Sequence, residues 1–217
     1  MAGHHAPEYP HLNFIYCTEQ CGICQWNQLS RYCFPNCLLC TVDDTSMYTN
    51  IDISHALEVL EGFFRTSPFA TGIDTDACLD TIRIIMHHNI FWFCDTTWIQ
   101  KNGTSMGTPP VPAYAQLYYL VHELMFMHTY PQLCYYIRYL VDIFLVQLPD
   151  PNPIIDATNW PGFQTCVNMF GNLRWNFDKC VRSISFLDLE VHLDSTGSLS
   201  TNIYEKALNL YLYLLPH

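Results

Sequence analysis

Basic residues are scarce in this chain. Lys and Arg together number 9 against 20 Asp and Glu, which gives a formal net charge of −11 over 217 residues. Affinity for nucleic acid comes chiefly from cations that neutralise phosphates. Judged by charge alone, the chain is not a nucleic-acid-binding protein.

The chain also lacks long apolar runs and a targeting segment. Its most apolar region, residues 114–148, is interrupted by charged side chains such as Glu123 and Arg138. No run therefore reaches the length of about 18 residues that a membrane span needs. The first residues have neither the cationic start nor the apolar core of a signal peptide. We expect an intracellular protein without a membrane partner.

Cysteine, in contrast, is abundant: there are 11, an odd number that argues against a full disulfide framework in a chain without a secretory signal. Six form a doubled pattern near the start: Cys17, Cys21, Cys24, Cys33, Cys37 and Cys40. The pairs Cys21/Cys24 and Cys37/Cys40 have the spacing of a zinc ribbon. Because Cys40 lies in an apolar run, we favour reduced, metal-free thiols; a zinc-stabilised binding module is the alternative.

The order of apolar and turn residues predicts an α+β fold, with an antiparallel sheet backed by helices. Residues 1–37 show no clean period and form a separate irregular segment, rich in Cys and His. Residues 38–43 predict a core strand, and Asp52 caps a helix that ends at Ser67 before Pro68. The further predicted elements are helices at 76–88, 113–127 and 157–172, hairpins at 90–100 and 135–146, and strands at 174–178, 183–193 and 199–206. In helix 76–88, the core side chains are expected to be Cys78, Ile82, Ile84 and Ile85.

Four segments follow one another in a characteristic order: Asp43–Ile51, Gln100–Thr108, Arg138–Phe144 and Ser185–Asp188. Together they resemble motif A, motif B, motif C and a Phe-Leu-Asp strand of reverse transcriptases of the Penelope-like retroelement type. The resemblance covers roughly residues 38–217. It implies a reverse transcriptase palm with the start of the thumb and with the fingers largely missing. In enzymes of this kind, much of the basic surface lies in the fingers and thumb rather than in the palm.

The resemblance also implies a site for RNA-directed DNA synthesis by two-metal phosphoryl transfer. Asp43 and Asp142 would converge and hold Mg²⁺ or Mn²⁺. Tyr48 would lie against the sugar of a deoxynucleotide, although a core tyrosine is the alternative for this ring. The remaining binding residues that the resemblance implies are Gln100, Gly103, Met106 and Gly107 of motif B, and Lys206, which would meet a phosphate.

One departure bears directly on activity. Val141 stands where the family has the first of two consecutive aspartates. Consecutive strand residues face opposite ways, so Asp142 cannot replace its neighbour, and Asp44 should face away from Asp43. We therefore expect low or no activity, with a catalytically dead palm that acts as a scaffold as the alternative. The expected partners are template-primer, dNTP and the remainder of a larger polyprotein, and the expected location is the nucleus.

Overall fold

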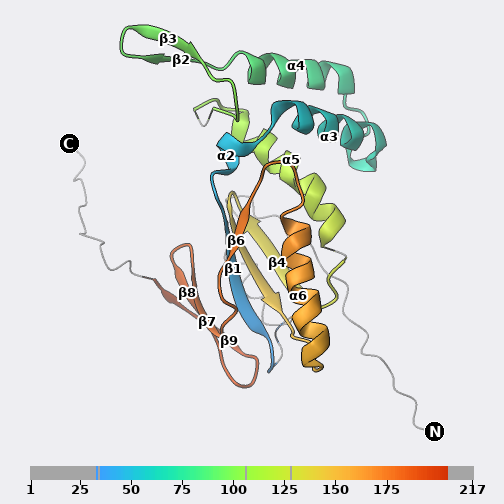
Figure 1. Cartoon of the computed structure of the whole chain (residues 1–217), viewed down its shortest axis with the longest axis vertical. Helices are drawn as coiled ribbons and strands as arrows, with labels where there is room; N and C mark the ends of the chain where they lie inside the picture. The colour runs from blue at the N-terminus through green and yellow to red at the C-terminus, as the bar shows by residue number, and fades with distance from the viewer. Residues whose placement is uncertain (1–32, 34, 106, 128, 205–217) are drawn as a thin grey trace. The chain divides into compact units, whose positions relative to one another are not determined.

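The computed structural model describes residues 33, 35–105, 107–127 and 129–204. Helices and antiparallel strands form a mixed α+β fold, as predicted (Figure 1). The chain divides into two compact units. One contains the segment that ends at Val42, then Gln132–Asp150 and the segment that starts at Phe177; the other contains Asp43–Pro131 and Pro151–Asn176.

A four-stranded sheet has the order β4-β5-β1-β6. Its strands are β1 (Leu38–Asp44), β4 (Leu133–Tyr139), β5 (Asp142–Gln147) and β6 (Trp175–Phe177). The predicted core strand is therefore confirmed and extends one residue further. β4 and β5 pair antiparallel around a two-residue turn at Leu140-Val141, which confirms the predicted hairpin.

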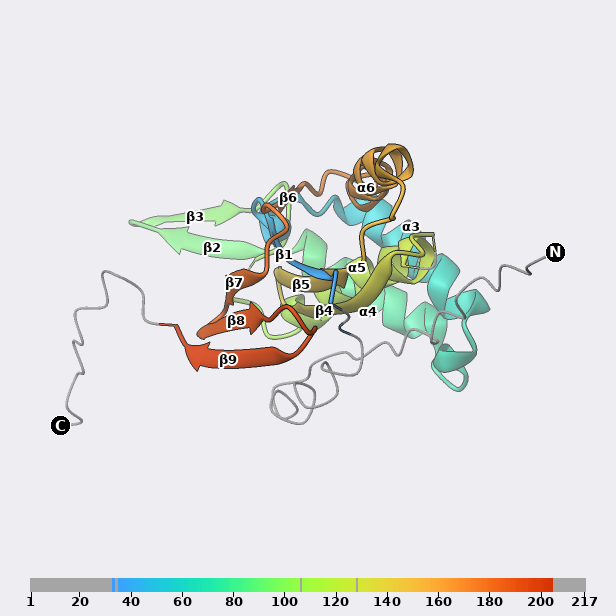
Figure 2. The same cartoon turned by 90° about the horizontal axis from the view of Figure 1, so that it is seen from below.

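A second, three-stranded sheet contains β7 (Ser183–Phe186), β8 (Leu189–Leu193) and β9 (Leu199–Ile203) in that order (Figure 2). The prediction of one strand over 183–193 was wrong. Leu187 has a φ of 54°, and the chain reverses there so that Phe186 pairs with Leu189. Buried side chains of both sheets, including Leu39, Phe144 and Val191, form one apolar cluster.

Two helices open the other unit and pack side by side (Figure 1). Helix α3 (Ile53–Thr66) starts at Asp52, whose carboxylate accepts the His55 N–H at 2.9 Å, and it ends at Ser67 before the short helix η2 (Pro68–Ala70). Helix α4 (Thr75–His87) is capped by Asp74. The expectation that Ile84 is a core residue was wrong: it is 62% exposed, and Leu79 and Met86 fill the buried positions.

Helices α5 (Val111–Phe126) and α6 (Pro153–Val167) complete this unit. The predicted helix at 157–172 was placed about four residues too late, because Asn152 caps the helix with Pro153 at its first position. An aromatic cluster packs around these helices, with His122 stacked on Phe170 at a centroid distance of 4.5 Å. Burial lowers the pKa of His122, so its ring is neutral in this apolar setting.

No helix in the described ranges has the length and apolar character that crossing a membrane requires.

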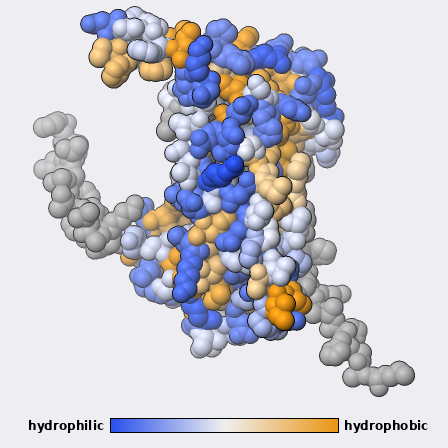
Figure 3. Space-filling view, in the orientation of Figure 1, coloured by the Kyte–Doolittle hydropathy of each residue, from blue (hydrophilic) through white to orange (hydrophobic). Residues whose placement is uncertain are grey.

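The hairpin of β2 (Ile90–Phe93) and β3 (Thr96–Ile99) forms a separate two-stranded sheet that confirms the predicted hairpin at 90–100. Every residue of both strands is exposed. Figure 3 shows the apolar side chains along it. Because its large apolar side chains are exposed, this hairpin has an uncovered apolar surface. An isolated hairpin of this size is only marginally stable in water.

Candidate functional site

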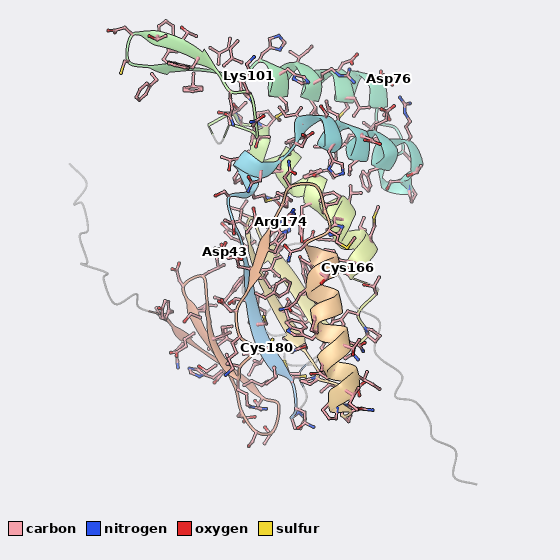
Figure 4. All side chains as sticks on the ribbon, in the orientation of Figure 1. Asp43, Asp76, Lys101, Cys166, Arg174 and Cys180 are labelled. Carbon is pink, nitrogen blue, oxygen red and sulfur yellow. The ribbon has the colours of Figure 1, made fainter. Side chains whose placement is uncertain are left out.

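The end of β1 presents two consecutive carboxylates with different surroundings. Asp43 is exposed (Figure 4), whereas Asp44 is 7% exposed. The alternation of side chains along the strand thus separates them, as predicted. Asp43 is the carboxylate of this pair that a ligand in solvent can reach.

The carboxylate of Asp44 is buried with little compensation. Neither oxygen has a hydrogen-bond partner of ordinary geometry among the described residues. Burial raises its pKa to about 6, and the backbone amides of Arg174 and Thr45 offset only part of this effect. The sequence predicted that Asp44 faces away from Asp43, but it gave no sign that the carboxylate would be buried with so few hydrogen-bond partners.

The motif A segment continues from β1 into the one-turn helix α2 (Met47–Asn50), and motif B is bound to it. The backbone N–H of Thr104 donates to the carbonyl oxygen of Tyr48 at 2.6 Å, and the Thr104 hydroxyl donates to the same oxygen at 3.1 Å. Thr104 is 1% exposed. Two segments more than fifty residues apart in the sequence therefore meet at one fixed point.

Gly103 makes this approach possible. Its φ is 70°, and a Cβ atom at this position would lie 2.5 Å from the Cα atom of Thr49. Any other side chain would need both a left-handed backbone and displacement of the motif A turn. The glycine predicted from motif B thus has a demonstrable structural role, at the contact with motif A.

The other predicted binding residues differ in their burial. Gln100 is half-buried, and its amide donates to the carbonyl oxygen of Asn102 at 2.8 Å, which closes the turn on itself. Gly107 is exposed, and Tyr48 is half-buried. Met106 and Lys206 lie outside the described residues.

Motif C forms the tip of the β4–β5 hairpin. Tyr139 pairs with Asp142, and Leu140 adopts a φ of 55° in the turn between them. The guanidinium of Arg138, which is buried, donates to the Leu140 carbonyl oxygen at 2.9 Å. Val141 and Asp142 are both half-buried. Because β5 is the neighbour of β1 in the sheet, Asp142 and Asp43 are carried by adjacent strands.

The donor set can be compared with the needs of a divalent cation. Within the described part of the chain, no group of three or more His, Cys, Asp and Glu side chains is arranged to hold a metal ion. Asp43 and Asp142 offer hard carboxylate oxygens, which Mg²⁺ prefers, and one or two carboxylates can suffice when substrate phosphates complete the shell. These residue types fit magnesium or manganese.

The front cysteines are described only in part. Cys33, Cys37 and Cys40 are thiols rather than disulfides, and the latter two are buried. The thiol of Cys40 donates to the carbonyl oxygen of Asp178 at 3.2 Å, which directs it into the unit that contains β1. Burial raises the pKa of Cys33 to about 12, with a smaller contribution from Cys37. Cys17, Cys21 and Cys24 lie outside the described residues, so the predicted absence of zinc stays a prediction.

Known proteins resemble this chain in fold but not in sequence. No family model matches, and no curated protein matches in sequence. Among solved structures, an apo telomerase from Candida tropicalis, truncated from its C-terminal domain, superposes with a TM-score of 0.60 at 10% identity. The match covers 87% of this chain and 40% of that one. This chain has a polymerase palm-like fold.

A second telomerase extends this result. The Candida albicans enzyme, in complex with a fragment of telomeric RNA, has a TM-score of 0.60 at 13% identity, over 87% of this chain and 36% of its own. The palm-like chain therefore spans about two fifths of each neighbour. At this identity the likeness concerns the fold, and site residues must be argued from the chain itself.

Proposed function

We propose that this chain is the palm of a reverse transcriptase of the Penelope-like type, which extends a primer along a template with deoxynucleotides. The observation that carries the proposal is the junction of motifs A and B. Thr104 is hydrogen-bonded to Tyr48, and Gly103 lies against Thr49, in a chain whose fold is palm-like. With this function we expect a nuclear protein that works as part of a larger polyprotein.

Asp43 and Asp142 would hold Mg²⁺ or Mn²⁺, which activates the primer 3′-hydroxyl and neutralises the triphosphate. Other residues of the chain would bind and position the nucleotide. The half-buried ring of Tyr48 would lie against the sugar and exclude a 2′-hydroxyl. Gly103 lets the motif B backbone approach the nucleotide closely. Lys206 would meet a phosphate.

Val141 is the reason to expect weak catalysis. The missing aspartate would act by holding a metal ion, whose positive charge stabilises the transition state, and loss of one such electrostatic contribution typically costs about 100-fold or more in rate. The side chain of Val141 is half-buried in a hairpin turn, so the site can accept an aspartate of similar volume without burying it fully.

Primer extension by the full chain tests the proposal. We expect faint Mn²⁺-dependent extension with dNTPs for the parent, a gain of about 100-fold for Val141→Asp, and loss of both with Asp43→Asn. Tyr48→Ala, combined with Val141→Asp, should admit ribonucleotides. If Val141→Asp binds template-primer but never extends it, the catalytic proposal fails and a scaffold palm is the correct description. If no template-primer is bound, the polymerase assignment itself falls.

A further inference from the structure

A polar cavity of about 500 Å³ adjoins the junction of motifs A and B. Thr49 and Gly103, the two residues in contact at that junction, both line it. The start of α3, the end of α4, the loop after β3 and the loop after α6 supply the other walls, all within the unit that contains Asp43–Pro131 and Pro151–Asn176. A volume of this size suits one nucleotide unit.

The wall next to motif A offers acceptors in fixed positions. The Asn50 amide group donates to the Thr45 carbonyl oxygen at 2.7 Å, which orients its own oxygen. One carboxylate oxygen of Asp52 accepts the His55 N–H at 2.9 Å, and no described residue donates to the other. These groups can read the polar edge of a base or a sugar hydroxyl.

Other lining residues offer donors that no described residue of the protein uses. Lys101, His87, Asn102 and Asn172 all line the cavity and are exposed. None of these four side chains makes a hydrogen bond or ion pair with another described residue. An ammonium group and uncommitted amides around a cavity suit a phosphate and the polar atoms of a nucleotide.

Lys101 also connects the cavity with the exposed hairpin. It follows β3 directly and lies at the base of the hairpin in Figure 4. Four of the strand residues are aromatic and exposed: Phe91 at 48%, Trp92 at 75%, Phe93 at 66% and Trp98 at 52%. Residues 89–100 contain no basic side chain. Aromatic faces without cations attract bases rather than phosphates, and stacking on such faces is tolerant of sequence.

We propose that this unit binds an unpaired nucleic acid strand, with a nucleotide and its phosphate in the cavity at Lys101 and neighbouring bases stacked on the β2–β3 hairpin. The inference rests on the proposed function and names the partner of that site as the single-stranded part of the template. It also explains how a chain with a charge of −11 can bind a polyanion. In this proposal, stacking on the hairpin supplies affinity that the scarce cations do not.

The test compares a blunt template-primer duplex with the same duplex carrying a single-stranded template extension, by fluorescence anisotropy over a range of salt concentrations. The parent should prefer the extended duplex. Lys101→Ala should reduce that preference and lower the slope of log affinity against log salt by about 0.7, the value for one phosphate contact on a single strand, and Lys101→Arg should restore both. Trp92→Leu should weaken binding of the extended duplex between about 5-fold and 100-fold.

Two matched variants serve as controls. Lys179→Ala removes an exposed lysine elsewhere, and Ile154→Ala removes an apolar side chain that is 76% exposed on α6. Neither should change the preference for the extended duplex. Quenching of tryptophan fluorescence by the extended duplex should persist in both controls and diminish in Trp92→Leu.

Three results would overturn the inference. Equal affinity of the parent for both duplexes would do so while the proposed function stood. Competition by free dNTP for the Lys101-dependent binding would make the cavity a triphosphate site. Loss of self-association in Trp92→Leu, with unchanged binding of the extended duplex, would make the hairpin a contact between copies of the chain. Failure to bind either duplex would instead remove the proposed function.

Discussion

At the scale of single residues, Asp44 carries a buried carboxylate whose burial the backbone amides of Arg174 and Thr45 offset only in part. Its pKa is raised from 3.8 to about 6, because burial disfavours the charge. Below pH of about 4 the group is protonated in the folded and the unfolded chain, so it does not affect stability. Between about pH 4 and 6 the unfolded chain ionises first, so the stability of the fold falls with rising pH and stays lower above pH 6.

Asp44→Asn should therefore stabilise the protein at neutral pH, by about 1–2 kcal/mol, and give no gain at pH 3.5. Chemical denaturation at several pH values measures this. Asp95→Asn removes a carboxylate from the exposed turn of the β2–β3 hairpin and supplies the background effect of lost surface charge. A gain from Asp44→Asn that is the same at pH 3.5 and pH 7.5 would contradict the assignment.

Leu140 is a second residue in an unfavourable setting. Its φ of 55° is in the left-handed region, which costs a side-chain-bearing residue roughly 1–2 kcal/mol. We expect Leu140→Gly to raise the free energy of unfolding by about 1 kcal/mol, because the greater freedom of glycine in the unfolded chain offsets part of the relief. Leu140→Ala keeps the strain and loses the same side chain, so it should not stabilise. Equal effects of the two variants would show that the turn is unstrained.

Single residues were predicted unevenly from the sequence. The opposite facing of Asp43 and Asp44 follows from the geometry of a strand, and it is confirmed by their exposure. The role of Gly103 followed from its motif, but its partner Thr49 did not. The cavity donor Asn172 had no signal at all, because its position depends on the course of the chain after α6.

At the scale of elements, the junction of motifs A and B depends on one close backbone approach. Gly103→Ala places a methyl group 2.5 Å from the Thr49 Cα atom at a φ of 70°. Gly72 has a φ of 89° with open space around it, so Gly72→Ala carries the backbone strain without the clash. We expect a cost of about 1 kcal/mol for Gly72→Ala and about 2–4 kcal/mol for Gly103→Ala. Denaturation curves compare the two directly.

Primer extension is a second measurement for Gly103→Ala and Gly72→Ala, with each substitution made in the Val141→Asp variant. Gly103→Ala in that background should lose extension, because the turn that holds Tyr48 is displaced, and Gly72→Ala should retain it. If the two alanine variants lose the same amount of stability, Gly103 of motif B is not in close contact with Thr49 of motif A.

Element boundaries were predicted well where a cap or a proline marks them. Asp52 and Ser67-Pro68 delimit α3, and both signals are visible in the sequence. The turn between β7 and β8 was missed because Leu187-Asp188 lacks the glycine or asparagine that usually occupies such turns. The pairing of Phe186 with Leu189 within the sheet determines this turn, and that pairing is not a local property.

At the scale of the whole molecule, the two-metal proposal requires Asp43 and Asp142 to share an ion. We expect Val141→Asp to be less stable than the parent in chelator, because a third carboxylate adds like-charge repulsion. Mg²⁺ or Mn²⁺ should restore the loss, since a ligand that binds only the folded state stabilises it. Thermal unfolding with and without divalent ions measures the difference.

The matched variant for this experiment is Val141→Asn, which has the same shape as the aspartate variant without its charge. It should show neither the loss in chelator nor the recovery with metal. Carboxylates of Asp43 and Asp142 more than about 10 Å apart in an experimental structure would remove the shared site, and the assignment of motif C with it.

The interleaved path of the chain has a consequence for synthesis on the ribosome. One compact unit is complete once Asn176 has been made, whereas the other needs the segment that begins at Phe177 to join β1, β4 and β5. Domains generally fold as their residues emerge. The helical unit can therefore form first, while β1, β4 and β5 wait with an exposed apolar face. During that interval the nascent chain is open to chaperones, and to pairing with the wrong strand.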